Sequence, residues 1–185
     1  MNFIKKIILG FLAALMALLG EQIISTLYFL FFNQEISENY FEKITPFLFL
    51  VVLIEEMFRY LAVKKSSSYS KEIRKYFSPA LAIGLGFFLA EIIFRFWDSN
   101  ILSFFSLEIL GIFFLHFIIS FLMIIILTAK KNELWKFILP AFVIHFIYNS
   151  LIIYNLGGLA VFIYLILISL ILAAFYSKNL LIQTS

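Results

Sequence analysis

Apolar residues fill most of the chain in long stretches, and short polar segments separate these stretches. A helix needs about 20 apolar residues to cross the hydrocarbon core of a bilayer, and six stretches approach or exceed that length. The predicted spans are residues 7–32, 44–63, 80–97, 101–128, 136–154 and 159–176. The pattern therefore predicts an all-α protein, a polytopic transmembrane helical bundle of about six spans.

Composition supports this fold class. Of the 185 residues, 64% are hydrophobic and 14% are charged, whereas soluble domains are about half apolar and a quarter charged. No repeat or linker divides the chain, so residues 1–185 are predicted to form a single integral-membrane domain in contact with the lipid bilayer. The absence of Cys excludes thiol catalysis, disulfides and thiolate metal sites. The basic residues cluster in loops, so nucleic acid is not an expected partner.

Charged residues at the span ends predict an orientation. The basic ones fall at alternate ends, at Lys5, Lys6, Lys64, Lys65, Lys71, Arg74, Lys75, Lys130, Lys131, Lys136 and Lys178. By the positive-inside rule both termini are cytoplasmic.

Because Lys-, Ile- and Asn-rich usage is typical of AT-rich microbial genomes, we expect a multi-pass protein of a bacterial cytoplasmic membrane. The sequence does not predict the oligomeric state.

Polar side chains inside the predicted spans indicate chemistry, because ionisable groups are costly in hydrocarbon. They are Glu21, Gln22, Glu55, Glu56, Arg59, Glu91, Arg95, Glu108, His116, Ser120, His145, Asn149 and Ser150. At about 1.5 Å of rise per residue, Glu55 and Glu56 lie ~10–13 Å from the cytoplasmic end, His145 ~14 Å, Glu91 ~16 Å and His116 ~18 Å. Four helices would thus place ionisable groups at similar depth, which predicts one polar intramembrane cavity.

Helical spacing places some of these groups on shared faces. Arg59 follows Glu55 by four residues and Glu56 by three, so its guanidinium can neutralise either carboxylate. A carboxylate partnered by a histidine suits a general base for water. His116, His145 and Glu91 can equally hold a zinc ion with an open position for water. The sequence leaves a zinc mechanism and a metal-free glutamate mechanism open.

Structural roles are the alternative for each of these residues. Glu55, Glu56 and Arg59 could form a polar clasp between helices, and a single histidine would be a hydrogen-bonded packing residue. Glu91 could simply pair with Arg95 on its own helix. Structural or interfacial roles are expected for the residues nearer the outer half, Glu21, Gln22 and Glu108. The shared depth of the others favours a functional site.

Four motifs occur in order on successive predicted helices. They are Glu-Glu-Met-Phe-Arg at 55–59, Gly-x-Gly-Phe-Phe-x-x-Glu at 84–91, a mid-span His at 116 and His-x-x-x-Asn at 145–149. This order resembles the PrsW-type intramembrane proteases, which belong with the CAAX prenyl-protease and bacteriocin-processing enzymes in one superfamily. The resemblance covers about residues 47–150.

The chain also departs from both patterns. Arg59 stands where the PrsW pattern has Lys, and Asn149 replaces the final Asp, as is typical of the CAAX branch. That branch, however, expects a Glu-Glu-x-x-x-Arg motif and a His in place of Glu91. The sequence is thus intermediate between the branches and nearer PrsW.

The resemblance implies hydrolysis of a peptide bond in a membrane-anchored protein or peptide substrate. Glu55 or Glu56 would activate water, with Glu55 the expected base by analogy with the CAAX branch. His116 and His145 would act as metal ligands or as partners of the base, and Glu91 would complete the site. Asn149 would act as an oxyanion donor, and Arg59 would hold the glutamate pair ionised.

Other functions compete with this hypothesis. One is a CAAX/Abi-type protease that acts in bacteriocin processing or immunity. Another is a proton-coupled transporter, but such proteins contain inverted repeats and broken helices, and the sequence has no matched pair. A third is a catalytically silent scaffold or chaperone, against which the complete set of glutamates and histidines argues.

Overall fold

The computed structural model describes residues 1–33, 46–66, 74–95, 107–128 and 134–184, and these residues are almost entirely helical. The helices are α1 (Phe3–Phe32), α2 (Pro46–Ser66), α3 (Arg74–Arg95), α4 (Leu107–Thr128), α5 (Leu134–Ile153) and α6 (Gly157–Thr184). Within these ranges there is no strand, so the predicted all-α helical bundle is confirmed.

Each helix matches one of the six predicted spans, and several extend beyond the apolar stretch. Residues 44–45, 96–97 and 101–106 of the predicted spans lie outside the described residues. Helix α1 begins at Phe3, because Asn2 caps it by accepting a hydrogen bond from the Lys5 backbone N at 3.0 Å. Helix α3 begins at Arg74, six residues before the predicted start at position 80. Hydropathy marks only the apolar part of a helix, and the backbone continues helical through the flanking polar residues.

Among the described residues, four helices are long and apolar enough to cross a membrane, so the chain is a membrane protein. The segments are Phe3–Phe32, Tyr76–Phe94, Ile109–Leu127 and Leu134–Ile153. Helix α2 has 21 residues, about 31 Å of helix, but Glu55, Glu56 and Arg59 at its centre lower its hydropathy. The described apolar part of α6, Gly158–Ile171, is shorter. Six spans and the cytoplasmic location of both termini stay predictions.

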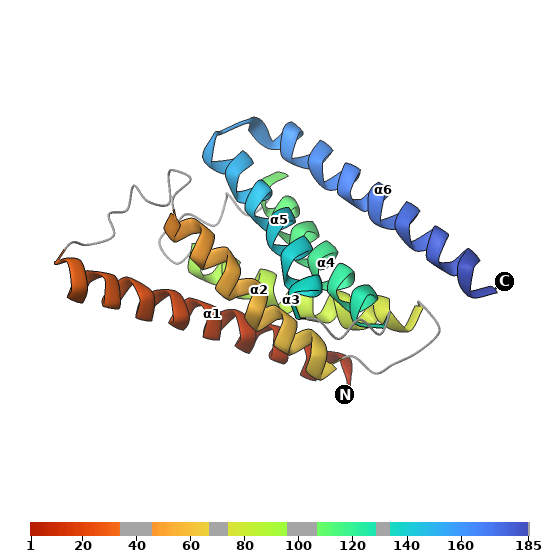
Figure 1. The fold of residues 1–185 in the computed structure, drawn as a ribbon, viewed down its shortest axis with the longest axis horizontal. Helices are drawn as coiled ribbons and strands as arrows, with labels where there is room; N and C mark the ends of the chain where they lie inside the picture. Colours follow the sequence, from red (N-terminus) through yellow and green to blue (C-terminus); the bar gives the residue numbers. More distant parts are fainter. Residues whose placement is uncertain (34–45, 67–73, 96–106, 129–133, 185) are drawn as a thin grey trace.

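The helices are arranged with α1 and α6 at opposite edges of the bundle and α2–α5 between them (Figure 1). Helix α1 packs against α2 and α3, whereas α6 packs against α4 and α5. The start of α1 and the end of α6 lie at the same end of the bundle (Figure 1). Large apolar side chains project outward from the edge helices, for example Leu30 and Leu159, which are 69% and 73% exposed. Such surfaces suit contact with lipid.

Glycines allow α3 to approach both of its neighbours closely. A Cβ atom placed on Gly84 would lie 2.9 Å from the Phe117 Cα of α4, and one placed on Gly86 would collide with the backbone of Ile7 in α1. Small residues at helix contacts are typical of membrane bundles. The close approach at Gly84 places the backbone of His116 and Phe117 directly against α3.

Candidate functional site

Arg59 binds both carboxylates of the glutamate pair on its own helix. Its Nε donates to Glu56 Oε2 at 3.0 Å and its Nη2 donates to Glu55 Oε1 at 2.7 Å. The sequence predicted that one guanidinium could neutralise either carboxylate, and here it contacts both. Arg59 and Glu56 are fully buried, so each charge has its counter-charge within the bundle, as buried ions require.

Arg59 also fixes the hydrogen positions of His116 on α4. Its Nη2 lies 2.8 Å from His116 Nδ1, and His116 Nε2 lies 2.6 Å from Glu91 Oε2. A guanidinium only donates hydrogen bonds, so Nδ1 accepts and Nε2 carries the hydrogen that is donated to Glu91. His116 therefore links the glutamate pair of α2 to Glu91 of α3.

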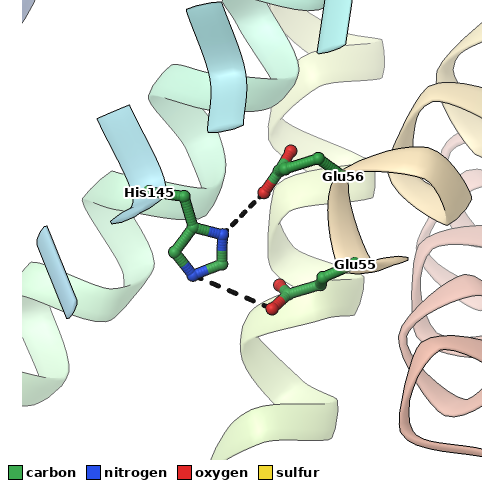
Figure 2. Close-up of side chains that lie close together, drawn as sticks. All are labelled: Glu55, Glu56 and His145. Carbon is green, nitrogen blue, oxygen red and sulfur yellow. Dashed lines mark hydrogen bonds and ion pairs between the residues drawn. The ribbon is translucent and has the colours of Figure 1, made fainter. Parts of the chain in front are cut away.

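His145 of α5 lies between the two glutamates (Figure 2). Its Nδ1 is 2.6 Å from Glu56 Oε1, and its Nε2 is 3.7 Å from Glu55 Oε2. A carboxylate only accepts, so His145 donates through Nδ1–H. In the neutral ring the Nε2 lone pair then faces Glu55. The distance of 3.7 Å is too long for a direct hydrogen bond.

The two glutamates differ in their access to open space. The Glu55 side chain is 19% exposed, whereas that of Glu56 is completely buried. Glu55 lines a pocket of about 560 Å³, and Glu56 lies behind it. Both oxygens of Glu56 are engaged, by Arg59 Nε and His145 Nδ1. Of the two carboxylates, only Glu55 combines an exposed side chain with an oxygen, Oε2, that makes no direct hydrogen bond to another described residue.

The pocket lies at one end of the bundle. Its lining residues come from four helices and are Ala14, Ala17, Leu18, Glu21, Gln22, Leu48, Val51, Glu55, Phe87, Ala90, Glu91, Phe94, His145, Asn149, Ile152 and Ile153. On α2 they fall near the start of the helix, whereas on α3 and α5 they fall near the end. Since α2 runs antiparallel to α3 and α5, these positions share one end of the bundle. Phe87 and His145 at the deep end are buried, and Gln22 and Phe94 are exposed.

The polar cavity expected from the sequence is present, and most of the predicted site residues meet there. Glu55, Glu91, His145 and Asn149 line it, and the other three predicted residues, Glu56, Arg59 and His116, form the buried layer behind. Asn149 lies one turn beyond His145. Glu91 pairs with His116, while the alternative partner Arg95 has a side chain outside the described residues, as does Glu108.

Three further residues of the site, Glu21, Gln22 and Phe87, were not expected from the sequence. Glu21 and Gln22 of α1, predicted to have structural or interfacial roles, line the pocket. Phe87 lies beneath the Arg59 guanidinium, with Cζ 3.9 Å from the ring centroid. Arg59 Nη1 has no hydrogen-bond partner among the described residues, and the ring face offers this buried cation a cation–π contact. The spacing of Phe87 and Glu91, which share a helix face, was the available signal.

A metal ion could be held by a set that differs from the predicted one. Glu55, Glu56 and His145 each offer one ligand atom, and these atoms all lie within 4.8 Å of one another. The predicted set of His116, His145 and Glu91 shares only His145 with this group. His116 and Glu91 are not in this group, and both ring nitrogens of His116 contact Arg59 and Glu91. Arg59 also competes with any ion for the two glutamates.

Comparisons of the chain with protein-family models, curated proteins and solved structures find no match. The resemblance to PrsW-type proteases therefore rests on the four motifs.

Proposed function

We propose that this protein is an intramembrane protease that hydrolyses a peptide bond of a membrane-anchored protein or peptide. The observation that carries the proposal is the meeting of Glu55 and His145 at the wall of a membrane-embedded pocket. A water molecule beside Glu55 Oε2 would also lie within reach of the His145 Nε2 lone pair. General-base activation requires one base within hydrogen-bond reach of the water, and the second acceptor would help to orient the water.

In the proposed reaction Glu55 is the general base. Its Oε2 takes a proton from water as the water oxygen attacks the carbonyl carbon of the scissile peptide bond. The carbonyl oxygen becomes an oxyanion, which the side-chain amide of Asn149 stabilises by donating a hydrogen bond. The C–N bond then breaks, and Glu55 returns the proton to the leaving amine.

The remaining residues hold Glu55 and His145 in place. Glu56 fixes His145 through Nδ1, so that Nε2 faces the pocket. Arg59 keeps Glu55 oriented at 2.7 Å, and His116 links Arg59 to Glu91. Catalytic sites depend on such supporting contacts because small displacements of the reacting groups lower the rate strongly.

The proposed protease could work with or without a zinc ion. Glu55, Glu56 and His145 are the residues that would hold the ion, and a bound zinc ion would polarise water and the substrate carbonyl. The cationic Arg59 beside both glutamates repels a second cation at the same carboxylates, which favours direct activation of water by Glu55. We therefore propose a glutamate protease whose activity survives treatment with a metal chelator.

The four motifs further support membership of the PrsW-type branch, and the apolar helices with the Lys-, Ile- and Asn-rich usage of the chain support a location in a bacterial cytoplasmic membrane. Helix α2 carries its glutamate pair and Arg59 on one face, as the Glu-Glu-x-x-Lys pattern of that branch implies. His-x-x-x-Asn places Asn149 in the same pocket as His145. Sequences of relatives of the chain would test the proposed membership of the PrsW-type branch.

The test is cleavage of membrane-anchored peptides by the purified protein in lipid nanodiscs. We expect Glu55→Gln to lower the rate by at least about 10³-fold, since it removes the base. Thr26→Ala is the matched control, because this α1 residue bonds only to the Gln22 backbone O and is exposed. Equal cleavage by wild type and Glu55→Gln contradicts the mechanism. Solute flux into proteoliposomes without any cleavage indicates a transporter instead.

A further inference from the structure

One of the carboxyl groups that line the pocket has no partner among the described residues. Three carboxylates line it, Glu21, Glu55 and Glu91, and no Lys or Arg occurs among its described lining residues. Glu55 is paired with Arg59 at 2.7 Å and Glu91 accepts a hydrogen bond from His116 at 2.6 Å. Glu21 makes neither a hydrogen bond nor an ion pair within the described chain. Among the three, Glu21 is thus the residue whose carboxyl group has neither oxygen engaged by a described residue.

The surroundings of Glu21 are apolar. The pocket wall near it consists mainly of aliphatic and aromatic side chains, Leu18, Leu48, Val51, Phe94, Ile152 and Ile153. An ionisable group in such a place within a membrane bundle is costly and generally has a function. A volume of about 560 Å³ lies within the range of ligand-binding pockets.

We propose that Glu21 is a specificity-determining residue that binds a cationic group of the substrate, the amine or guanidinium of a peptide. A Lys or Arg side chain fits this pocket best, because its apolar stem can lie along the aliphatic wall while its charged end reaches a carboxylate. The inference rests on the proposed function, since it names the substrate feature that the same pocket selects.

The position of Glu21 suits this role. It lies on α1, whereas the proposed base and its partners lie on α2, α3, α4 and α5. The residues proposed for catalysis and the residue proposed for substrate selection would therefore lie on different helices that line one pocket. Gln22 beside Glu21 also lines the pocket but is neutral, which makes it a control for the charge.

Binding of defined peptides to the purified full-length protein tests the inference. The probes are labelled Ala/Leu helices with blocked ends that contain either one central Lys or norleucine at that position. A third probe contains norleucine and a free amino terminus, which separates a side-chain amine from a chain-end amine. Binding is measured by fluorescence anisotropy in phosphatidylcholine nanodiscs, and cleavage of the same peptides is measured by mass spectrometry.

Wild type is expected to bind the Lys peptide about tenfold more tightly than the norleucine peptide, the effect of one charge-assisted hydrogen bond. Gln22→Ala should keep this preference, Glu21→Gln should remove it, and Glu21→Lys should instead prefer a peptide with a central Glu. A preference for the free amino terminus would support the same site and identify the chain end as the cationic group. Equal binding of all probes by wild type, or a Lys preference that survives Glu21→Gln, overturns the inference.

The two readouts separate this inference from the proposed function. Cleavage of the Lys and norleucine peptides at equal rates and with equal binding overturns the role of Glu21 alone. A Lys preference in binding that depends on Glu21, with no cleavage of any membrane-anchored peptide, supports the role of Glu21 and overturns the protease.

Discussion

Replacing Glu56 with Gln should reverse the hydrogen positions of His145. Glu56 accepts from both Arg59 Nε and His145 Nδ1, but a Gln side chain has only one acceptor oxygen. Since Arg59 can only donate, the amide oxygen must face Arg59 and the amide NH₂ must face His145 Nδ1. The ring must then accept at Nδ1 and carry its hydrogen on Nε2, which turns a donor toward Glu55.

The expected effects differ in size for stability and for activity. Arg59 keeps Glu55 at 2.7 Å and keeps an acceptor at position 56, but it loses one counter-charge. A hydrogen bond to a charged group contributes about 1.5–3 kcal/mol, so we expect the free energy of unfolding to fall by about 2 kcal/mol. A histidine in the wrong tautomer beside a catalytic group lowers kcat by about 10⁴-fold. Glu56→Gln should therefore be folded and nearly inactive.

The assay is nitrogen NMR of protein labelled only at histidine, which gives two rings because the chain has two histidines. In wild type we expect the hydrogen of His116 on Nε2 and that of His145 on Nδ1. In Glu56→Gln the hydrogen of His145 should move to Nε2, while His116 serves as an internal control and stays unchanged. A His145 ring that keeps its hydrogen on Nδ1 in the variant, or full peptidase activity, would refute this reasoning.

Three further predictions concern the same bundle. Arg59→Lys should lower the melting temperature and reduce cleavage about 10–100-fold, because one ammonium cannot reproduce the fixed fork that contacts two carboxylates and a histidine; equal activity would contradict the positioning role of Arg59. Gly86→Ala should destabilise the bundle by about 2–4 kcal/mol, measured by thermal unfolding, because its Cβ would collide with the α1 backbone; an unchanged melting temperature would contradict the close packing. Single cysteines in this cysteine-free chain test orientation: a membrane-impermeant thiol reagent added to intact cells should label Asn155→Cys and not Lys65→Cys, and the reverse pattern would contradict the predicted topology.

Hydropathy predicted the helices well because length and apolarity are what a bilayer requires of a helix. It could not predict their ends, since Asn2 caps α1 and polar residues from Arg74 continue into α3. It also could not predict which face of each helix is buried. A helix such as α1 is apolar all round, so its lipid-facing and core-facing sides look alike in sequence. Structural or interfacial roles were expected for Glu21 and Gln22 because of their depth nearer the outer half, but both line the pocket.

Contacts between residues that are close in the sequence were predictable, whereas contacts between different helices were not predictable in detail. Arg59 contacts Glu55 and Glu56 within one helical turn, and these contacts follow from spacing alone. The bond between His145 and Glu56 joins residues 89 positions apart, so it depends on how α2 and α5 rotate and pack. Shared depth correctly predicted that the histidines meet the glutamates, but it could not predict which ring nitrogen faces which carboxylate.

The most direct test of the central claim is cleavage of a membrane-anchored peptide in water enriched in oxygen-18. If Glu55 activates water for attack on the peptide carbonyl, the new carboxyl terminus formed by wild type contains one solvent oxygen, and Glu55→Gln forms essentially no product. Mass spectrometry of the fragments measures both. Intact peptides with the wild-type protein, or labelled product formed equally well by Glu55→Gln, would contradict the account.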